Sequence, residues 1–139
     1  MIIPENLLEK YNSPVPRYTS YPPANYFTDQ VTEGQYIEAV KDSNHRNPQN
    51  ISLYIHIPFC KKLCFYCGCN TLPLATMDEM EKYVTALKQE IRMVAALIDK
   101  GRKVSQIHYG GGTPNVIPSE WIAQINELIY SLFKLTDHP

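Results

Sequence analysis

Apolar and polar residues alternate strictly in one short stretch of the chain. In ISLYIHI, residues 51–57, isoleucine and leucine occupy every second position, and Tyr54 and His56 lie between them. This alternation predicts a β-strand with an apolar face and a polar one, so the tyrosine and the histidine share the polar face. A second strand is expected over residues 103–109, KVSQIHY.

Each predicted strand is followed by a segment with helical periodicity. After residue 76, apolar side chains recur every three or four positions. Thr76 and Glu79 have the spacing of a capping box, so we expect the helix to begin there and to stop at Gly101. We expect Ser119 to cap a second helix, whose apolar face runs from Trp121 to Phe133.

The order strand, loop, helix, strand, loop, helix predicts an α/β fold with parallel strands and right-handed crossovers. A cysteine-rich loop, FCKKLCFYCGCN, follows the first strand, and YGGGTP ends the second. Sites in α/β folds lie at the carboxyl ends of the strands. We therefore expect the cysteines and the glycines to meet at one rim of the sheet.

Residues 1–50 have a different composition and read as an N-terminal arm and linker. They are rich in proline, tyrosine and asparagine, and the stretch NSPVPRYTSYPPANYF is expected to be extended, because each proline disfavours helix at the preceding residue. A short helix is expected at residues 33–42. The α/β part is assigned to residues 51–139.

Charge and hydropathy exclude some partners. The 139 residues carry 13 basic and 14 acidic side chains, so no basic field favours nucleic acid or an anionic membrane. The start of the chain does not read as a signal peptide, and no apolar run approaches the roughly 18 residues of a membrane helix. We expect a cytoplasmic protein, in which clustered cysteines are metal ligands or catalytic groups more often than disulfides.

All four cysteines lie between positions 60 and 69, spaced C-x3-C-x2-C-x-C. Disulfides would lack a partner elsewhere in the chain. A zinc site is a second alternative, although the single residue between Cys67 and Cys69 makes joint binding of one small ion awkward. An iron–sulfur cubane fits the spacing better, because thiolates from one irregular loop can reach three of its corners. The fourth iron would then be open to a non-protein ligand.

The segment YIHIPFCKKLCFYC, followed by YGGGTP and preceded by KYNSPVPRYTSYP, resembles the radical S-adenosylmethionine (SAM) enzymes. More narrowly, it is similar to the oxygen-independent coproporphyrinogen III oxidase (dehydrogenase) family. The resemblance implies that Cys60, Cys64 and Cys67 bind a [4Fe-4S] cluster whose open iron takes SAM. It implies a partial, TIM-like barrel, of which this chain would carry the arm and the first two strand–helix units.

The family's reaction is the oxygen-independent oxidative decarboxylation of coproporphyrinogen III to protoporphyrinogen IX in haem biosynthesis. A 5'-deoxyadenosyl radical abstracts hydrogen from the β-carbon of a propionate, and loss of carbon dioxide leaves a vinyl group. The resemblance implies a porphyrinogen substrate, an electron donor whose identity is open, and a monomeric complete enzyme. Five residues match its SAM-contacting positions: Tyr54, Tyr66, Gly111, Gly112 and Thr113. His56 is either a functional residue or a hydrogen-bonded core histidine.

Cys69 separates the oxidases from related haem chaperones, which share the cluster loop but usually lack this cysteine and the arm. A chaperone remains the alternative function. Cys69 is either a thiol near the substrate or a small buried hydrophobe. In the arm, Arg17 and Tyr21, together with Tyr18, either contact the carboxylates and flat ring of the substrate or pack the arm through their aromatic rings.

The family's third strand is expected to begin only after residue 139, and with it an acidic SAM ligand. The chain therefore reads as an N-terminal fragment that is inactive alone.

Overall fold

The computed structural model describes most of the chain, namely residues 4–11, 23–73 and 75–137. The chain divides into two compact units, residues 1–33 and 34–139, and each is described by itself. In the first unit, α1 spans Glu5–Tyr11 and a 3-10 turn, η1, spans Ala24–Tyr26. The sequence pattern did not predict α1. The extended stretch expected around Arg17 and Tyr21 lies largely outside the described residues.

Three parallel strands form the sheet of the second unit, in the order β1 (Ile51–Ile57), β4 (Lys103–Gly111) and β5 (Lys134–Leu135). The two predicted strands are therefore present and parallel, as expected. The third strand begins at Lys134, earlier than predicted. With two residues, β5 is too short to carry an alternation, and its pairing with β4 defines it.

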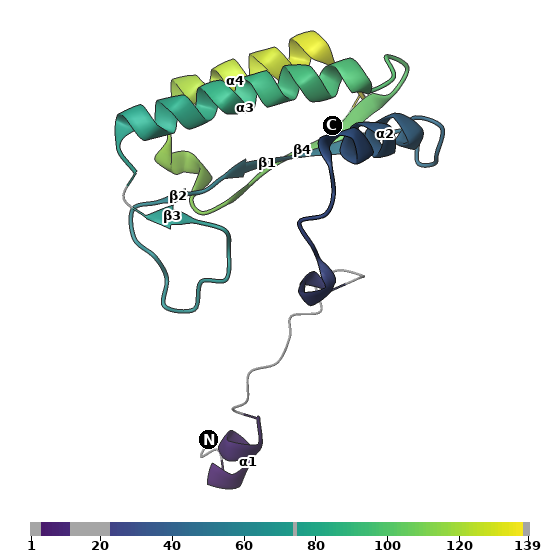
Figure 1. Cartoon of the computed structure of the whole chain (residues 1–139). Coiled ribbons are helices and arrows are strands. Elements are labelled where there is room, and N and C mark those ends of the chain that lie inside the picture. Colours follow the sequence, from purple (N-terminus) through teal and green to yellow (C-terminus); the bar gives the residue numbers. More distant parts are fainter. Residues whose placement is uncertain (1–3, 12–22, 74, 138–139) are drawn as a thin grey trace. The chain divides into compact units, whose positions relative to one another are not determined.

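Two long helices, α3 (Met77–Leu97) and α4 (Ser119–Leu132), lie side by side and cover the same face of the sheet (Figure 1). Their apolar residues and the isoleucines of β1 form one core. The fully buried side chains at its centre include Ile57, Ile125 and Ile129. The apolar face predicted for each helix is therefore the face that packs on the sheet.

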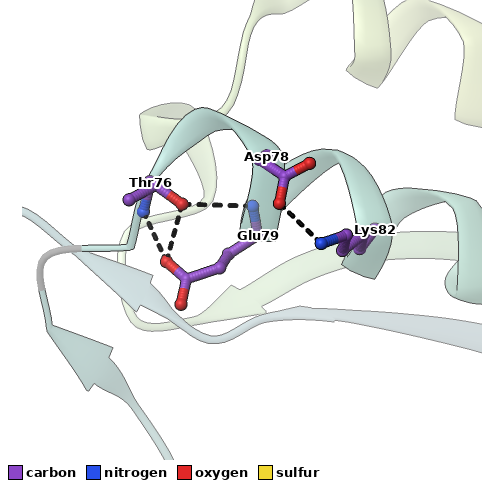
Figure 2. A network of polar contacts seen from close by, with 4 residues as sticks. All are labelled: Thr76, Asp78, Glu79 and Lys82. Atoms are coloured by element: carbon purple, nitrogen blue, oxygen red, sulfur yellow. Dashed lines mark hydrogen bonds and ion pairs between the residues drawn. The ribbon is translucent and has the colours of Figure 1, made fainter.

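The start of α3 has the predicted capping box (Figure 2). The Glu79 amide donates to Thr76 Oγ1 at 3.3 Å, and the Thr76 amide donates to Glu79 Oε2 at 2.7 Å. Asp78 and Lys82 form an exposed ion pair one turn apart, at 2.6 Å. These bonds satisfy amide groups that the first turn of a helix leaves without partners.

Two helix boundaries differ from the prediction. α3 ends at Leu97, and Ile98 is already extended, so the helix does not reach Gly101. Ser119 is the first residue of α4 rather than its cap, because Pro118 occupies the N-cap position with a φ of −53°. The proline ring, which limits φ, therefore sets the entry into this helix.

The predicted short helix is present as α2 (Glu33–Ser43). The buried guanidinium of Arg102 connects its end to the sheet: Nε donates to the Gln49 carbonyl at 3.0 Å, and an Nη donates to Ser43 Oγ at 3.0 Å. Within the described ranges, no helix has the length and apolar character that crossing a membrane requires.

Candidate functional site

The cysteine loop and the glycine turn meet at the carboxyl ends of β1 and β4, as predicted. Directly after β1, the short strand β2 (Phe59–Cys60) pairs in parallel with β3 (Leu72–Pro73), and the loop between them carries the other three cysteines. The Gly112 amide donates to the Ile57 carbonyl at 2.8 Å, and the Thr113 amide donates to the Phe59 carbonyl at 2.9 Å. Backbone hydrogen bonds therefore join the two segments.

Two glycines of the turn are required by close contacts. A Cβ on Gly112 would lie 2.6 Å from the Phe59 carbonyl oxygen and 2.7 Å from Cys60 Sγ. Gly111 has a φ of +107°, which side chains rarely adopt, and its Cβ would lie 2.6 Å from the Ile57 carbonyl oxygen. Because β4 continues to Gly111, the first two glycines belong to the strand and not to the loop that the sequence predicted.

The four cysteines are not bonded to one another as disulfides, which contradicts that alternative for this structure. Cys60 is buried, whereas Cys64, Cys67 and Cys69 are exposed. Two thiols contact threonine hydroxyls: Cys60 Sγ lies 3.6 Å from Thr113 Oγ1, and Cys67 Sγ lies 3.9 Å from Thr71 Oγ1. The interpretation of Cys69 as a buried hydrophobe is wrong, since the loop that carries it projects into solvent.

The polar face of β1 holds a hydrogen-bonded pair. His56 Nε2 lies 2.8 Å from the Asn70 carbonyl oxygen, and a carbonyl only accepts, so Nε2 carries the proton. Nδ1 can then accept from the Tyr54 hydroxyl at 3.2 Å. His56 is half-buried, has a partner at each ring nitrogen and contacts the cysteine loop through Asn70. Both interpretations of His56, as a functional residue and as a hydrogen-bonded core histidine, therefore stay predictions.

His108 is a site neighbour that sequence reasoning missed. It pairs with Tyr54 across the parallel strands, and the two rings stack with centroids 5.7 Å apart and planes 17° apart. A Cβ on Gly110 would lie 2.6 Å from the Tyr54 ring. Only the register of β1 against β4 creates this arrangement, so the alternation of β1 alone could not predict it.

Two half-buried phenols brace the site from the core side. The Tyr83 hydroxyl donates to the His56 carbonyl at 2.6 Å, and burial, followed by the charge of Glu90, raises the pKa of Tyr83. The Tyr109 hydroxyl donates to Asn126 Oδ1 at 2.7 Å, and burial raises the pKa of Tyr109 to about 12. Both phenols therefore stay protonated at neutral pH and act as hydrogen-bond donors.

Three predicted site residues remain: Tyr66, Arg17 and Tyr21. Tyr66 is 87% exposed, so its ring lies in solvent. Arg17 and Tyr21 lie outside the described residues.

Comparison with known proteins decides the family. No family model matches the chain. An oxygen-independent coproporphyrinogen III oxidase of Mannheimia haemolytica is 39% identical over 132 residues, which are 94% of this chain and 87% of that sequence. The chain belongs to the oxygen-independent coproporphyrinogen III oxidase family.

Other members of this oxidase family are much longer. The oxidases of Synechocystis and Escherichia coli are 39% and 43% identical, and the chain spans 28% and 27% of their lengths. The solved structure of the Escherichia coli coproporphyrinogen III oxidase, described as a radical SAM enzyme, superposes with a TM-score of 0.75 at 38% identity, over 95% of this chain and 28% of that one. The α/β fold with a parallel sheet is thus shared with part of that enzyme.

The donor set of the oxidase-family loop suits an iron–sulfur cluster. Within the described part of the chain, no three histidine, cysteine or acidic side chains converge as they would on a single metal ion. Cys60 at the end of β2, and Cys64 and Cys67 in the loop after it, nevertheless present three thiols close in sequence, none of them in a disulfide. The missing side chain of Gly112 leaves space beside the Cys60 thiol. Soft thiolate ligands select such clusters, and a larger cofactor needs less convergence than one ion.

Proposed function

We propose that this chain carries the cluster-binding and SAM-binding part of an oxygen-independent coproporphyrinogen III oxidase. The reaction is the oxidative decarboxylation of coproporphyrinogen III to protoporphyrinogen IX in haem biosynthesis. The observation that carries the proposal is the junction of the cysteine loop and the glycine turn through the hydrogen bonds from Gly112 and Thr113. Family membership at 39% identity supports it.

The proposed architecture is the beginning of a partial, TIM-like barrel, formed by residues 51–139 after an arm and linker at residues 1–50. Support comes from the strand order β1-β4-β5, which follows the order along the chain, and from two crossover helices on one face. In a doubly wound sheet, by contrast, the strand order reverses and the helices cover both faces.

Cys60, Cys64 and Cys67 would hold a [4Fe-4S] cluster, which with SAM supplies one-electron reductive cleavage and radical chemistry. Cys60 comes from the paired strand β2 and is buried, so it is the anchored ligand. The other two lie in the exposed loop, which can adjust to the shape of the cluster. Metal binding and ordering of this loop are therefore expected to be coupled.

Gly111, Gly112 and Thr113 would bind SAM at the rim, where the missing side chains let a ligand approach the backbone. Tyr54 would contact SAM from the polar face of β1. Its ring orientation is restrained by stacking on His108 and by the hydroxyl contact with His56. These residues position the ligand and need no change of protonation to do so.

Residues of the loop and arm complete the proposal. Tyr66 would lie near the adenine of SAM. Cys69 is exposed on the same loop, and its thiol would contact the substrate. Arg17 and Tyr21 would contact the substrate, whose carboxylates match the guanidinium of an arginine. We propose a cytoplasmic location, a monomeric complete enzyme and an electron donor that reduces the cluster.

Anaerobic reconstitution tests the proposal. The chain is expressed and incubated with iron and sulfide, and iron, sulfide and zinc are quantified. We expect iron and sulfide in equal amounts, close to four of each per chain, as a [4Fe-4S] cluster requires. Stoichiometric zinc without sulfide would contradict the cluster assignment.

The haem chaperone is the alternative, and haem titration separates it from the oxidase. The presence of Cys69 favours the oxidase. Tight haem binding by this chain, without SAM binding after reconstitution, would favour the chaperone. Weak haem binding together with SAM binding supports the oxidase.

A further inference from the structure

The contact between Thr113 and Cys60 joins the glycine turn to the cysteine loop through side chains. Thr113 Oγ1 donates toward Cys60 Sγ at 3.6 Å, within the range for a hydrogen bond to sulfur. Cys60 is 8% exposed, so the contact lies at the buried side of the thiol. We propose that Thr113 is a positioning residue for Cys60, and that its hydroxyl hydrogen bond raises the reduction potential of the cluster. This inference rests on the proposed function.

The local backbone leaves the Thr113 hydroxyl available for this role. Thr113 precedes the 3-10 turn η2 (Pro114–Val116) as its N-cap, yet its side chain makes no capping hydrogen bond. The turn is instead fixed by backbone bonds, from the Thr113 amide to Phe59 and from the Val116 amide to the Thr113 carbonyl. Removal of the hydroxyl should therefore leave the turn in place.

Glycine at position 112 makes the contact possible. A Cβ there would lie 2.7 Å from Cys60 Sγ and would displace the thiol from the threonine. The glycine and the threonine thus have complementary effects on one sulfur: the first leaves space beside it, and the second donates to it.

The chemistry of the hydroxyl allows a second contact. A threonine hydroxyl has one donor hydrogen and two acceptor lone pairs. With the hydrogen directed to Cys60 Sγ, the lone pairs could still accept from an N–H of the amino group of SAM. The role of Thr113 toward SAM and its role toward Cys60 are therefore compatible.

The expected effect on the cluster follows from electrostatics. A cysteine must be deprotonated to bind a metal, so Cys60 Sγ becomes an acceptor in the loaded protein. A hydrogen-bond donor to this sulfur stabilises the reduced cluster more than the oxidised cluster, because reduction adds negative charge. Hydrogen bonds to sulfur are among the determinants of cluster potentials. Loss of the hydroxyl should make the cluster harder to reduce.

The experiment compares variants of the reconstituted 139-residue chain without SAM, which removes the ligand contact from the comparison. The midpoint potential is measured by anaerobic redox titration, followed through the electron paramagnetic resonance signal of the reduced cluster. The variants are Thr113→Val, which keeps the shape, Thr113→Ala as a second hydroxyl-free variant, and Thr113→Ser, which keeps the hydroxyl. Iron and sulfide content is measured for each.

A matched control lies at the opposite end of β4. Thr136, whose amide donates to the Val104 carbonyl, is about 25 Å away from the site, given the rise per residue of a strand. Its hydroxyl is buried and has no hydrogen-bond partner among the described residues. Thr136→Val makes the same chemical change far from the cysteines. The midpoint potential of the cluster in this variant should therefore equal that in the parent chain.

We expect Thr113→Val and Thr113→Ala to shift the midpoint potential to more negative values, and Thr113→Ser to restore it. Full iron content with an unchanged potential in both hydroxyl-free variants would overturn this inference and leave the proposed function intact. A shift in Thr113→Ser as large as that in Thr113→Val would also overturn it. Failure of the parent chain to bind iron and sulfide would overturn the proposed function and this inference together.

Discussion

Gly112 lies where the cysteine-bearing segment and the glycine turn pack closely together. Its missing side chain admits both the Phe59 carbonyl and the Cys60 thiol, and its amide donates to Ile57. A motif of three glycines does not by itself show whether glycine is required by close contacts or only by the geometry of the turn. The contact distances make the distinction, because two of the nearest atoms belong to the backbone and cannot rotate away.

Gly112→Ala should therefore disturb the cysteine loop. The added methyl group meets backbone at 2.6 Å, so β2 or the turn must move, and Cys60 moves with it. We expect the variant to lose most of its bound iron after reconstitution. Gly101→Ala is the matched control: its Cβ would meet only the Asp99 side chain, at 3.0 Å, and the carboxylate can turn aside. Equal iron content in the two variants would contradict the role assigned to Gly112.

The cysteines should differ in their effects on the cluster. Replacement of Cys60, Cys64 or Cys67 by alanine should abolish it, because three thiolates are the minimum for a cubane with one open iron. Cys69→Ala should retain nearly all the iron, and in the complete enzyme it should lower turnover. Iron and sulfide analysis checks the first expectation and an activity assay the second. Iron loss in Cys69→Ala equal to that in the other variants would show that Cys69 is a ligand.

At the scale of the element, α3 has the clearest local determinants. Its capping box forms within one turn, from residues close in sequence (Figure 2). Its apolar stripe packs on the sheet. The helix connects the end of β3 to the start of β4, so its first turn lies directly after the loop that holds the cysteines. A stable first turn of α3 is therefore expected to restrict the motion of the cysteine loop.

Thr76→Ala should lower the free energy of unfolding by about 1 kcal/mol, the usual cost of losing a side-chain N-cap. Chemical denaturation of the parent and the variant measures the difference. Thr85→Ala serves as the control, since Thr85 is exposed in the middle of the same helix and alanine is the better helix former there. A loss of stability in Thr85→Ala as large as that in Thr76→Ala would argue against the cap.

The capping box should also make stability depend on pH. Hydrogen bonds from the backbone and then the side chain of Thr76 lower the pKa of Glu79 below its ordinary value of 4.5. A lowered folded-state pKa gives a contribution that is fully present above pH 4.5 and disappears as the pH falls through the folded-state pKa. Glu79→Gln should flatten the pH dependence of the unfolding free energy in that acidic range. An unchanged slope would exclude Glu79 as its source.

At the scale of the whole molecule, the two faces of the sheet in the second unit differ. α3 and α4 lie on the face that carries the isoleucines (Figure 1). The other face carries Tyr54, which is 58% exposed, and its neighbour His108. Among the described residues, β1 pairs with β4 alone, so its second edge is unpaired. The exposed ring of Tyr54 is therefore accessible to a ligand.

The isolated chain should be of low stability and should not cleave SAM. An unpaired strand edge and an uncovered sheet face reduce the apolar area buried on folding, and net stabilities are small even for complete domains. The bound cluster should be lost quickly to a chelator. Thermal unfolding by circular dichroism and the formation of 5'-deoxyadenosine after anaerobic reconstitution check this. A sharp cooperative transition together with SAM cleavage would contradict the prediction.

Local patterns in the sequence determined much of the fold and pointed to the site. The alternation in β1, the capping box of α3 and the apolar stripes of both helices are short-range features, so they were predictable. The order of the elements implied parallel strands, and that topology placed the cysteines and the glycines at one rim. The resemblance to the oxidases rested on the same two segments.

Tertiary structure decided what depends on register and on pairing between distant segments. β2, β3 and β5 have two residues each and are strands only because of their partners. Three contacts of the site and the core join residues that are 53 to 59 positions apart in the sequence. They are the stacking of Tyr54 on His108, the hydrogen bond from Arg102 to Ser43 and the contact of Thr113 with Cys60. Sequence patterns report the periodicity of one segment, whereas such contacts require the relative placement of two.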